Sequence, residues 1–456
     1  MVWWHRLYRW FWAAPSEVST TSRGRADAPR PQPTAQRATQ AAPSASAPLH
    51  VPMPAGVMLR REELLDAHSA LAGFRLTVTP SGIGQADVTP QGRVDALNAG
   101  RSRHLAERRT ALITVPLHDW DPDLYAPLTG PGTVFETAAP DMDSPPRDTL
   151  DRLRALQASG ASVALRASDD PALAHAPIWD LASHAMVRFD PHAPRRFEQV
   201  CRSLRAAHPH LRLITDGVPT WPEHRLCASL GASLVLGDFL HTVDEQAAAD
   251  DDRGQRSTLL ELLNLVRCDA ELARIAEAVK REPGVAVHLL AMANAPAYGL
   301  RQPLTGIEQA VQVIGRDTLY RWLAVAVFRA GADAPRDATL LEVALARARF
   351  LELAGQSQGH RQQADELFLL GLLSFIDKVL GRPMAEVLGR LSVPSAVLDV
   401  LLRNEGPYLH LLTLAISIEK CLARRAQDIA QRLGFDLGQL HDMRQAAVQW
   451  AEDAAR

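Results

Sequence analysis

Four charged residues stand where short β-rich segments end in the first half of the chain, and their side chains could do chemistry together. Glu136 ends TVFE, Arg166 ends SVALR, Asp190 ends MVRFD and Asp216 follows LRLIT. Carboxylates that converge on one small volume can hold divalent cations and activate a water molecule. Guanidinium groups in the same volume repel such cations and instead bind phosphate oxygens or pair with the carboxylates.

The segments that carry these residues recur at a nearly constant spacing. They begin at Thr133, Ser162, Met186, Leu211 and Ser233, which are 29, 24, 25 and 22 residues apart. A strand, a crossover helix and the loops between them take about this length, so the repeat predicts parallel strands joined by helices. The product is either a β/α barrel or an open doubly wound sheet, and in both the carboxyl ends of the strands share one edge.

The second half of the chain has the period of helices. After the polar, acidic segment from Asp244 to Thr258, apolar residues recur with a period of 3.6 to the end. Thr305 and Glu308 form a capping box before a helix that starts near Ile307. Further helices are predicted at about 319–328, 340–355, 365–380 and 410–424, so this half is predicted to be all-helical.

The order of segments from Arg60 to Leu240 resembles the EAL family, cyclic di-GMP phosphodiesterases with a modified β/α barrel, in the shortened form that precedes HDOD domains. The opening RREELLDAHSALAGFRL keeps the family's shape, and TVFETAAP, VALRASDD, MVRFD, LITDGVPT and LVLGDF follow in the family's order. Glu136, Asp190 and Asp216 keep acidic side chains. The resemblance implies that other acids are replaced, by Arg75, Arg166, Ala167 and Pro219.

Residues 259–402 resemble the HDOD family, a helical module related to HD phosphohydrolases but lacking their metal-binding residues. Asn294, Gly315 and Trp322 match its pattern, as does Gly371-Leu372-Leu373. Where an HD enzyme needs adjacent His and Asp, this sequence has Ser374-Phe375. We expect Asn294 to hydrogen-bond the backbone at a helix end and Trp322 to pack in the core.

These replacements predict a non-catalytic signalling or regulatory scaffold, without metal or cofactor, that binds an unidentified protein partner through its HDOD domain. The alternative is a cyclic di-GMP receptor or a residual cyclic di-GMP phosphodiesterase. Its ligand site would use the strand-end residues Glu136, Arg166, Asp190 and Asp216. We favour the interpretation that the arginines pair with Glu136 and Asp190 over the interpretation that they bind phosphate.

Composition narrows the class of protein. The formal net charge of -3 gives no basic field, so we expect no nucleic-acid partner. The four cysteines lie far apart without a C-x-x-C pair, the chain shows no secretory leader, and no apolar run is long enough to cross a bilayer. These features favour a cytoplasmic bacterial protein.

The first twelve residues, MVWWHRLYRWFW, concentrate aromatic side chains and arginine. Trp3, Trp4, Trp10 and Trp12 could rest at the headgroup level of a membrane and give weak peripheral attachment. The segment could instead dock onto the barrel or a partner, or reflect a wrongly assigned start codon. The predicted organisation is an aromatic tip and disordered linker at 1–54, a degenerate EAL-like β/α barrel at 55–243 and an all-α HDOD domain at 255–456.

Overall fold

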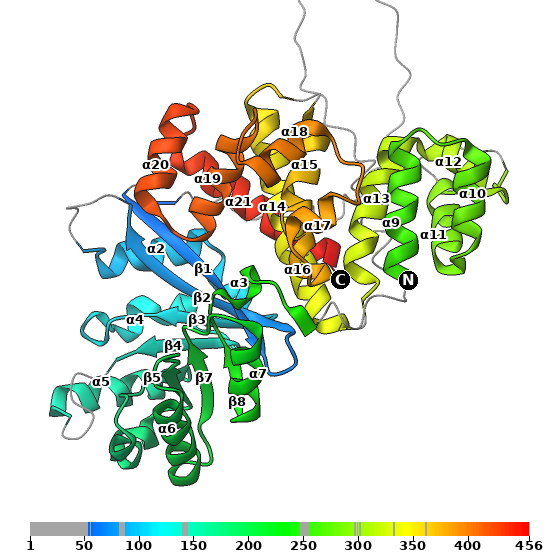
Figure 1. Ribbon diagram of the computed structural model, residues 1–456. Coiled ribbons are helices and arrows are strands. Elements are labelled where there is room, and N and C mark those ends of the chain that lie inside the picture. The colour runs from blue at the N-terminus through cyan, green and yellow to red at the C-terminus, as the bar shows by residue number, and fades with distance from the viewer. Residues whose placement is uncertain are drawn as a thin grey trace, which may run out of the picture.

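A computed structural model describes residues 53–54, 56–81, 87–138, 145–246, 255–295, 298, 300, 302–331, 333–360 and 363–455. Figure 1 shows a barrel, coloured blue to green, beside a helical half, coloured green to red. Trp3, Trp4, Trp10 and Trp12 lie outside the described residues, so their membrane contact stays a prediction. Within the described part of the chain, no helix is both long enough and apolar enough to span a membrane.

The first half forms a closed barrel of eight strands in the order β1 to β8. The strands are β1 (Val57–Asp66), β2 (Leu71–Pro80), β3 (Thr110–Thr114), β4 (Thr133–Thr137), β5 (Ser162–Arg166), β6 (His184–Arg188), β7 (Arg212–Asp216) and β8 (Ala232–Val235). Strand β1 is antiparallel to both of its neighbours, and all other pairs are parallel. The predicted β/α barrel is confirmed, and the open-sheet alternative is wrong.

Alternation along the strands separates the barrel interior from its outer layer. A small apolar cluster fills the interior, with Leu64, Leu112, Val134, Ala164, Met186, Ile214, Leu234 and Leu236. Close approach of β2 to β3 requires Gly73, since a Cβ there would lie 2.0 Å from the Thr110 carbonyl oxygen. Glu136 and Arg166 follow the interior residues Val134 and Ala164 by two positions. Because alternate residues face the same side, both side chains point inward, at the mouth formed by the carboxyl ends of the parallel strands.

Helices and 3-10 turns surround the barrel. The helices are α2 (Pro90–Ala99), α3 (Ser102–Ala106), α4 (Pro122–Tyr125), α5 (Arg147–Ala158), α6 (Pro194–Ala207) and α7 (Trp221–Ser229). The 3-10 turns are η1 (Leu117–Asp119), η2 (Ala126–Leu128), η3 (Pro171–His175), η4 (Pro177–Leu181) and η5 (Asp238–His241). Helix α2 packs on one part of the β1–β2 hairpin.

In the second half the described elements are helical. They are α9 (Gln255–Arg267), α10 (Leu272–Lys280), α11 (Pro283–Ala293), α12 (Ile307–Ile314), α13 (Arg316–Arg329), α14 (Ala334–Ser357), α15 (Ala364–Leu373), α16 (Ile376–Leu380), α17 (Met384–Leu388), α18 (Ser395–Leu398), a π-helical turn (Asp399–Arg403), α19 (Leu409–Glu419), α20 (Ala423–Arg432) and α21 (Leu437–Ala455). The predicted helices at 319–328 and 340–355 lie inside α13 and α14.

Three local predictions for this half need correction. The segment 365–380 is not one helix, because it breaks after Leu373. The segment 410–424 breaks at Cys421, whose φ of 49° is left-handed. Helix α12 begins at Ile307 as predicted, but its N-cap is Gly306 and no side chain caps it, so the capping box is wrong.

Asn294 and Trp322 behave as predicted. The Asn294 amide follows α11, where Nδ2 donates to the Leu304 carbonyl at 2.8 Å and Oδ1 accepts from the Leu304 N–H at 2.5 Å. Trp322 is buried in α13. Both side chains therefore have structural roles that follow from their position.

The two halves share one apolar core. A continuous cluster of buried residues runs from the outer layer of the barrel, including Leu65, Phe74 and Leu76, into the helical half. Helix α14 packs on β2, and α19 packs on β1. The last described element of the barrel ends at His241, and the first helix of the helical half begins at Gln255. Because one core joins the two halves, the domain limits 55–243 and 255–456 stay a prediction.

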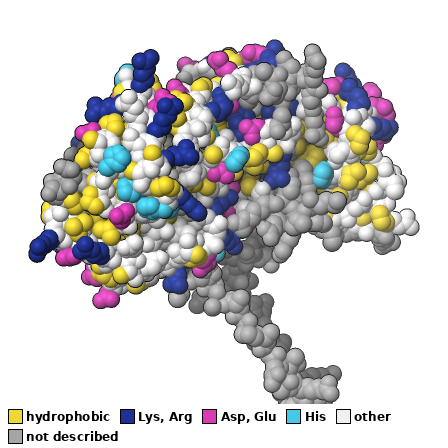
Figure 2. Space-filling model, turned by 90° about the horizontal axis from the view of Figure 1, so that it is seen from below, with side chains coloured by type: hydrophobic (Ala, Val, Ile, Leu, Met, Phe, Trp, Pro, Cys, Tyr) yellow, Lys and Arg dark blue, Asp and Glu magenta, His cyan; other side chains and the backbone are white. Residues whose placement is uncertain are grey.

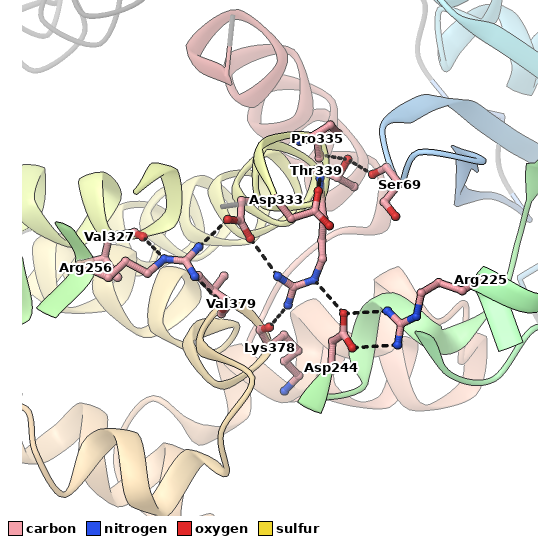
Figure 3. A network of polar contacts seen from close by, with 12 residues as sticks. Ser69, Arg225, Asp244, Arg256, Val327, Asp333, Pro335, Thr339, Lys378 and Val379 are labelled. Atoms are coloured by element: carbon pink, nitrogen blue, oxygen red, sulfur yellow. Dashed lines mark hydrogen bonds and ion pairs between the residues drawn. The ribbon is translucent and has the colours of Figure 1, made fainter. Parts of the chain in front are cut away.

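A buried polar network also ties the halves together where the chain leaves the barrel (Figure 3). Arg225 of α7 donates to both carboxylate oxygens of Asp244, at 3.1 and 3.2 Å. Arg336 of α14 lies 3.5 Å from the same carboxylate through Nε and donates to Asp337 at 3.0 Å. Although the sequence predicts a polar joint from Asp244 to Thr258, the structure buries Asp244 and Arg256.

Arg256 completes this network at the start of α9. Its Nη2 donates to Asp337 at 2.6 Å, and its Nε and Nη1 donate to the carbonyl oxygens of Val327 and Val379. Arg256 and Asp337 are 3% and 2% exposed, so the charges compensate each other away from water. Gly331 leaves room for the pair, since a Cβ there would lie 1.8 Å from the Asp337 carboxylate.

Asp337→Asn should therefore lower the free energy of unfolding by about 3–5 kcal/mol, because Arg256 and Arg336 would lose a buried counter-charge. Urea denaturation of the full chain measures the change. Asp399→Asn is the matched control, since its pair with Arg403 is exposed and is worth at most about 0.5 kcal/mol. Equal effects of the two substitutions would show that the buried network does not stabilise the fold.

Candidate functional site

Side chains from five strands meet at the mouth of the barrel and form what we call the mouth cluster. Its members are Arg60 and Glu62 of β1, Arg75 of β2, Glu136 of β4, Arg166 of β5 and Asp216 of β7. Of the four residues predicted for the site, the structure brings together Glu136, Arg166 and Asp216. Their position follows from strand alternation, which points them inward above the apolar layer.

Arg75 links two carboxylates of the mouth cluster. Its Nε donates to Glu62 at 2.7 Å and its Nη1 donates to Asp216 at 2.7 Å. Burial opposes the charge of Arg75, but its hydrogen bond to Glu62 and the attraction of Asp216 outweigh the effect of burial and raise the pKa of the guanidinium above its ordinary value. Arg75 is therefore a fixed cation in the mouth.

Arg166 holds the other carboxylate. It donates to Glu136, and its Nη1 lies 3.6 Å from the Asp216 carboxylate. The Thr114 hydroxyl donates to Glu136 at 3.1 Å. The Glu136 side chain has no exposed surface, so these partners supply the hydrogen bonds that water would otherwise provide.

Asp190 does not join the mouth cluster. It is exposed, and its carboxylate accepts a hydrogen bond from the backbone N–H of His192 at 2.8 Å. The predicted pairing with Glu136 is confirmed for Arg166 but not for Arg75, which pairs with Glu62 and Asp216. Pairing with Asp190 is wrong, because Asp190 lies beyond the end of β6 and caps a turn. The second carboxylate that the arginines approach is that of Asp216.

Sequence reasoning missed Glu62. Its Oε1 lies 2.7 Å from Arg60 and its Oε2 accepts from Arg75. The available signal was the pairing of an antiparallel hairpin, in which Glu62 stands opposite Arg75. That register could not be read from the repeat of parallel strands.

The mouth cluster is balanced in charge and occupied by its own ion pairs. Its three carboxylates belong to Glu62, Glu136 and Asp216, and its three guanidinium groups belong to Arg60, Arg75 and Arg166. A divalent cation would have to displace these pairs against the repulsion of fixed cations. Within the described ranges, no group of three His, Cys, Asp or Glu residues is arranged to hold a metal ion.

In the helical half, an ion pair between Arg347 and Glu419 lies against Ser374 and Phe375. Arg347 of α14 donates through Nη1 to the Ser374 hydroxyl at 2.8 Å and through Nε to Glu419 of α19 at 3.0 Å. Its guanidinium carbon lies 4.2 Å from the centre of the Phe375 ring. Sequence reasoning pointed to Ser374-Phe375 but not to Arg347 or Glu419, which lie far away in the chain.

The family comparison assigns the first part of the helical half. The family model of the HDOD domain matches residues 257–386. Residues 257–386 are an HDOD domain. The matched residues begin within α9 and end within α17, so Arg347 and Ser374 lie inside the HDOD domain and Glu419 follows it. The predicted combination of an EAL-like barrel and an HDOD domain is confirmed.

Two curated relatives match parts of the chain. It is 25% identical over 248 residues to the uncharacterized protein YuxH of Bacillus subtilis, covering 53% of this chain and 59% of that protein. It is 23% identical over 188 residues to the cyclic di-GMP phosphodiesterase CdgJ of Vibrio cholerae, covering 41% of this chain and 43% of that protein. The chain thus spans about half the length of the curated relatives it matches.

Among solved structures, the chain is similar to EAL proteins. The Xanthomonas citri FimX EAL domain in complex with c-diGMP aligns at 14% identity and a TM-score of 0.33, covering 41% of this chain and 87% of that chain. Klebsiella pneumoniae BlrP1 in a calcium and cyclic di-GMP complex aligns at 14% identity and a TM-score of 0.32, covering 42% of this chain and 56% of that chain.

The ion pairs of the mouth cluster give a direct stability test. Arg166→Met should lower the free energy of unfolding by about 2–3 kcal/mol, because Glu136 would lose its charged hydrogen-bond donor while staying buried. Urea denaturation measures this, and the double variant Arg166→Met with Glu136→Gln should recover part of the loss.

Arg202→Met serves as the control, since Arg202 makes an exposed pair with Glu198 on α6. It should change the unfolding free energy by less than about 0.5 kcal/mol. If Arg166→Met behaves like Arg202→Met, the mouth ion pairs do not hold the barrel.

Proposed function

We propose that this chain is a non-catalytic bacterial signalling protein that works in cyclic di-GMP networks and binds a protein partner through its HDOD domain. One observation carries the proposal. At the mouth of the barrel, Arg75 and Arg166 engage the inward carboxylates Glu62, Glu136 and Asp216. Metal-assisted phosphodiester hydrolysis needs such carboxylates free to hold cations.

The HDOD domain supports a role in interaction. The ion pair of Arg347 and Glu419 engages Ser374, where a metal-dependent HD enzyme would need ligands. The relation to cyclic di-GMP comes from similarity, because CdgJ is named a cyclic di-GMP phosphodiesterase.

A second candidate function is a cyclic di-GMP receptor that needs no metal. The side chains of Arg60 and Arg166 are each 40% exposed at the mouth, so part of each guanidinium faces solvent. Arg188 is also exposed at the end of β6. Guanidinium groups of this kind can bind phosphate oxygens in two-point contacts.

Seen from below, Lys and Arg side chains are interspersed with Asp and Glu side chains on the described part of the surface (Figure 2). A mixed-sign surface favours partners recognised by local contacts over partners attracted by a long-range field. The described surface thus gives no sign of a partner that is attracted by charge alone.

Incubation of the full chain with cyclic di-GMP and either Mg²⁺ or Mn²⁺ tests the absence of catalysis. We expect no hydrolysis above the protein-free control when nucleotides are separated by chromatography. Metal-dependent turnover that Glu136→Ala abolishes would refute the non-catalytic proposal.

Calorimetric titration with cyclic di-GMP in the presence of EDTA tests the receptor function. If the receptor candidate is right, Arg166→Ala weakens binding by about tenfold or more, the effect of losing one charged hydrogen bond. Arg202→Ala removes the same charge from an exposed pair on α6 and should leave the affinity unchanged. Absence of binding by the unmodified chain would remove this candidate.

A further inference from the structure

The β1–β2 hairpin faces two environments at once. Glu62 and Arg75, which stand opposite each other, point into the mouth cluster. Their neighbours Glu63 and Phe74, also opposite each other, line a cavity on the outer side. Because alternate residues of a strand face opposite sides, the same hairpin contacts both the mouth and the helical half.

The cavity lies between the barrel and the helical half. It has a volume of about 70 Å³. Its apolar wall includes Leu71, Phe74, Val343, Phe350 and Ala415. The lining also includes charged side chains and His241, and a volume of this size is large enough to hold water.

Two of the charged residues that line the cavity form ion pairs between the barrel and the helical half. Arg61 of β1 donates to Glu452 of α21 at 2.7 Å. Arg109, which precedes β3, donates to both carboxylate oxygens of Glu342 on α14 at 2.7 and 2.8 Å. Each pair joins the barrel to the helical half, so side chains of opposite charge link the two halves at this interface.

Within the helical half, Arg347 of α14 pairs with Glu419 of α19. Burial alone would raise the pKa of Glu419, but the charge and hydrogen bond of Arg347 outweigh it and lower that pKa below its ordinary value. Arg444 of α21 donates to the Ile418 carbonyl at 3.2 Å. From η5, His241 faces the cavity, and burial lowers its pKa to about 4.

Glu63 differs from these groups. Among the described side chains, none forms a hydrogen bond or an ion pair with its carboxylate. Burial raises its pKa; its own backbone N–H and the charges of Arg444 and Arg61 act in the opposite direction, and Glu419 adds to the increase. Glu63 is thus a carboxyl group that the packed interface favours in its protonated form.

We propose that Glu63 makes the contact between the barrel and the helical half sensitive to protons. With Glu63 protonated, the hairpin packs against α14, α19 and α21. Ionisation places a carboxylate without a hydrogen-bonded side-chain partner beside Phe74 and Phe350 and weakens that packing, although Arg61 and Arg444 attract it from a distance.

The direction with pH follows from proton binding. The packed state has the higher pKa at Glu63, so it binds more protons than a state in which the interface has opened. Packing is therefore strongest at low pH and is lost progressively as the pH rises through the pKa of the packed state. His241 is neutral and Glu419 ionised over that range, so neither accounts for the change.

Hydrogen exchange of the full chain, corrected for the intrinsic rate at each pH, tests the proposal between about pH 5.5 and about pH 8.5. Protection of residues 57–80 and 437–455 should fall as the pH rises over this range, because ionisation of Glu63 favours the opened interface. Residues 307–314 in α12, which line no part of the cavity, serve as the internal reference.

Glu63→Gln should keep the protection measured at low pH and abolish its fall. The matched control is Glu277→Gln on α10, an exposed pair with Lys280, which should follow the unmodified profile. A flat profile for the unmodified chain, or an unchanged fall in Glu63→Gln, would overturn the proposal.

A second measurement covers the case in which Glu63→Gln does not fold. In the unmodified chain, a carbon-13 titration of the Glu63 carboxyl should give a midpoint above the ordinary Glu value of about 4.3. A midpoint at or below that value would overturn the proposal.

Discussion

Burial of the outer face of the β1–β2 hairpin is the constraint on which both halves of this molecule depend. In the barrel, helix α2 packs on only part of that face. The rest carries Phe74 and Leu71, which contact the helical half around the cavity. Each large apolar side chain that is removed from water contributes about 1.5–3 kcal/mol, so the barrel and the helices stabilise each other.

The same constraint fixes the mouth cluster. A shift of the hairpin by one residue would exchange Glu62 with Glu63 and Arg75 with Phe74, which would bring a phenyl ring into the mouth and a guanidinium into the apolar interface. Packing of the outer face therefore holds the ion pairs of the inner face in register. Arg75 in particular can join Glu62 to Asp216 because β2 is held on both sides.

The sequence predicted well those features that depend on short-range pattern. The strands around Glu136, Arg166 and Asp216 follow from a repeat of apolar segments, and their shared mouth follows from the parallel arrangement. Contacts that depend on distant segments could not be predicted in this way. Glu62 requires the register of an antiparallel hairpin, and Arg347 requires the approach of α19 to α14.

The joint between the halves shows the same limit. The acidic run after Asp244 has the composition of an exposed linker, yet Asp244 is buried by Arg225 and Arg336, which come from different helices. Composition reports the average preference of a segment, whereas burial is decided by the partners that the fold supplies. A single charged residue with two cationic partners can therefore be buried although the composition of its segment predicts exposure.

Mutual burial also restricts where a protein partner can bind the HDOD domain. The barrel already covers the face of α14 that carries Val343 and Phe350, so a partner of the intact chain has to use another surface. Helices α10, α11 and α12 lie on the side away from the barrel (Figure 1). Residues 255–456 taken alone would expose the covered face of α14, and an apolar surface of that kind binds proteins without specificity. Binding to the helical half is therefore meaningful only when it persists in the full chain.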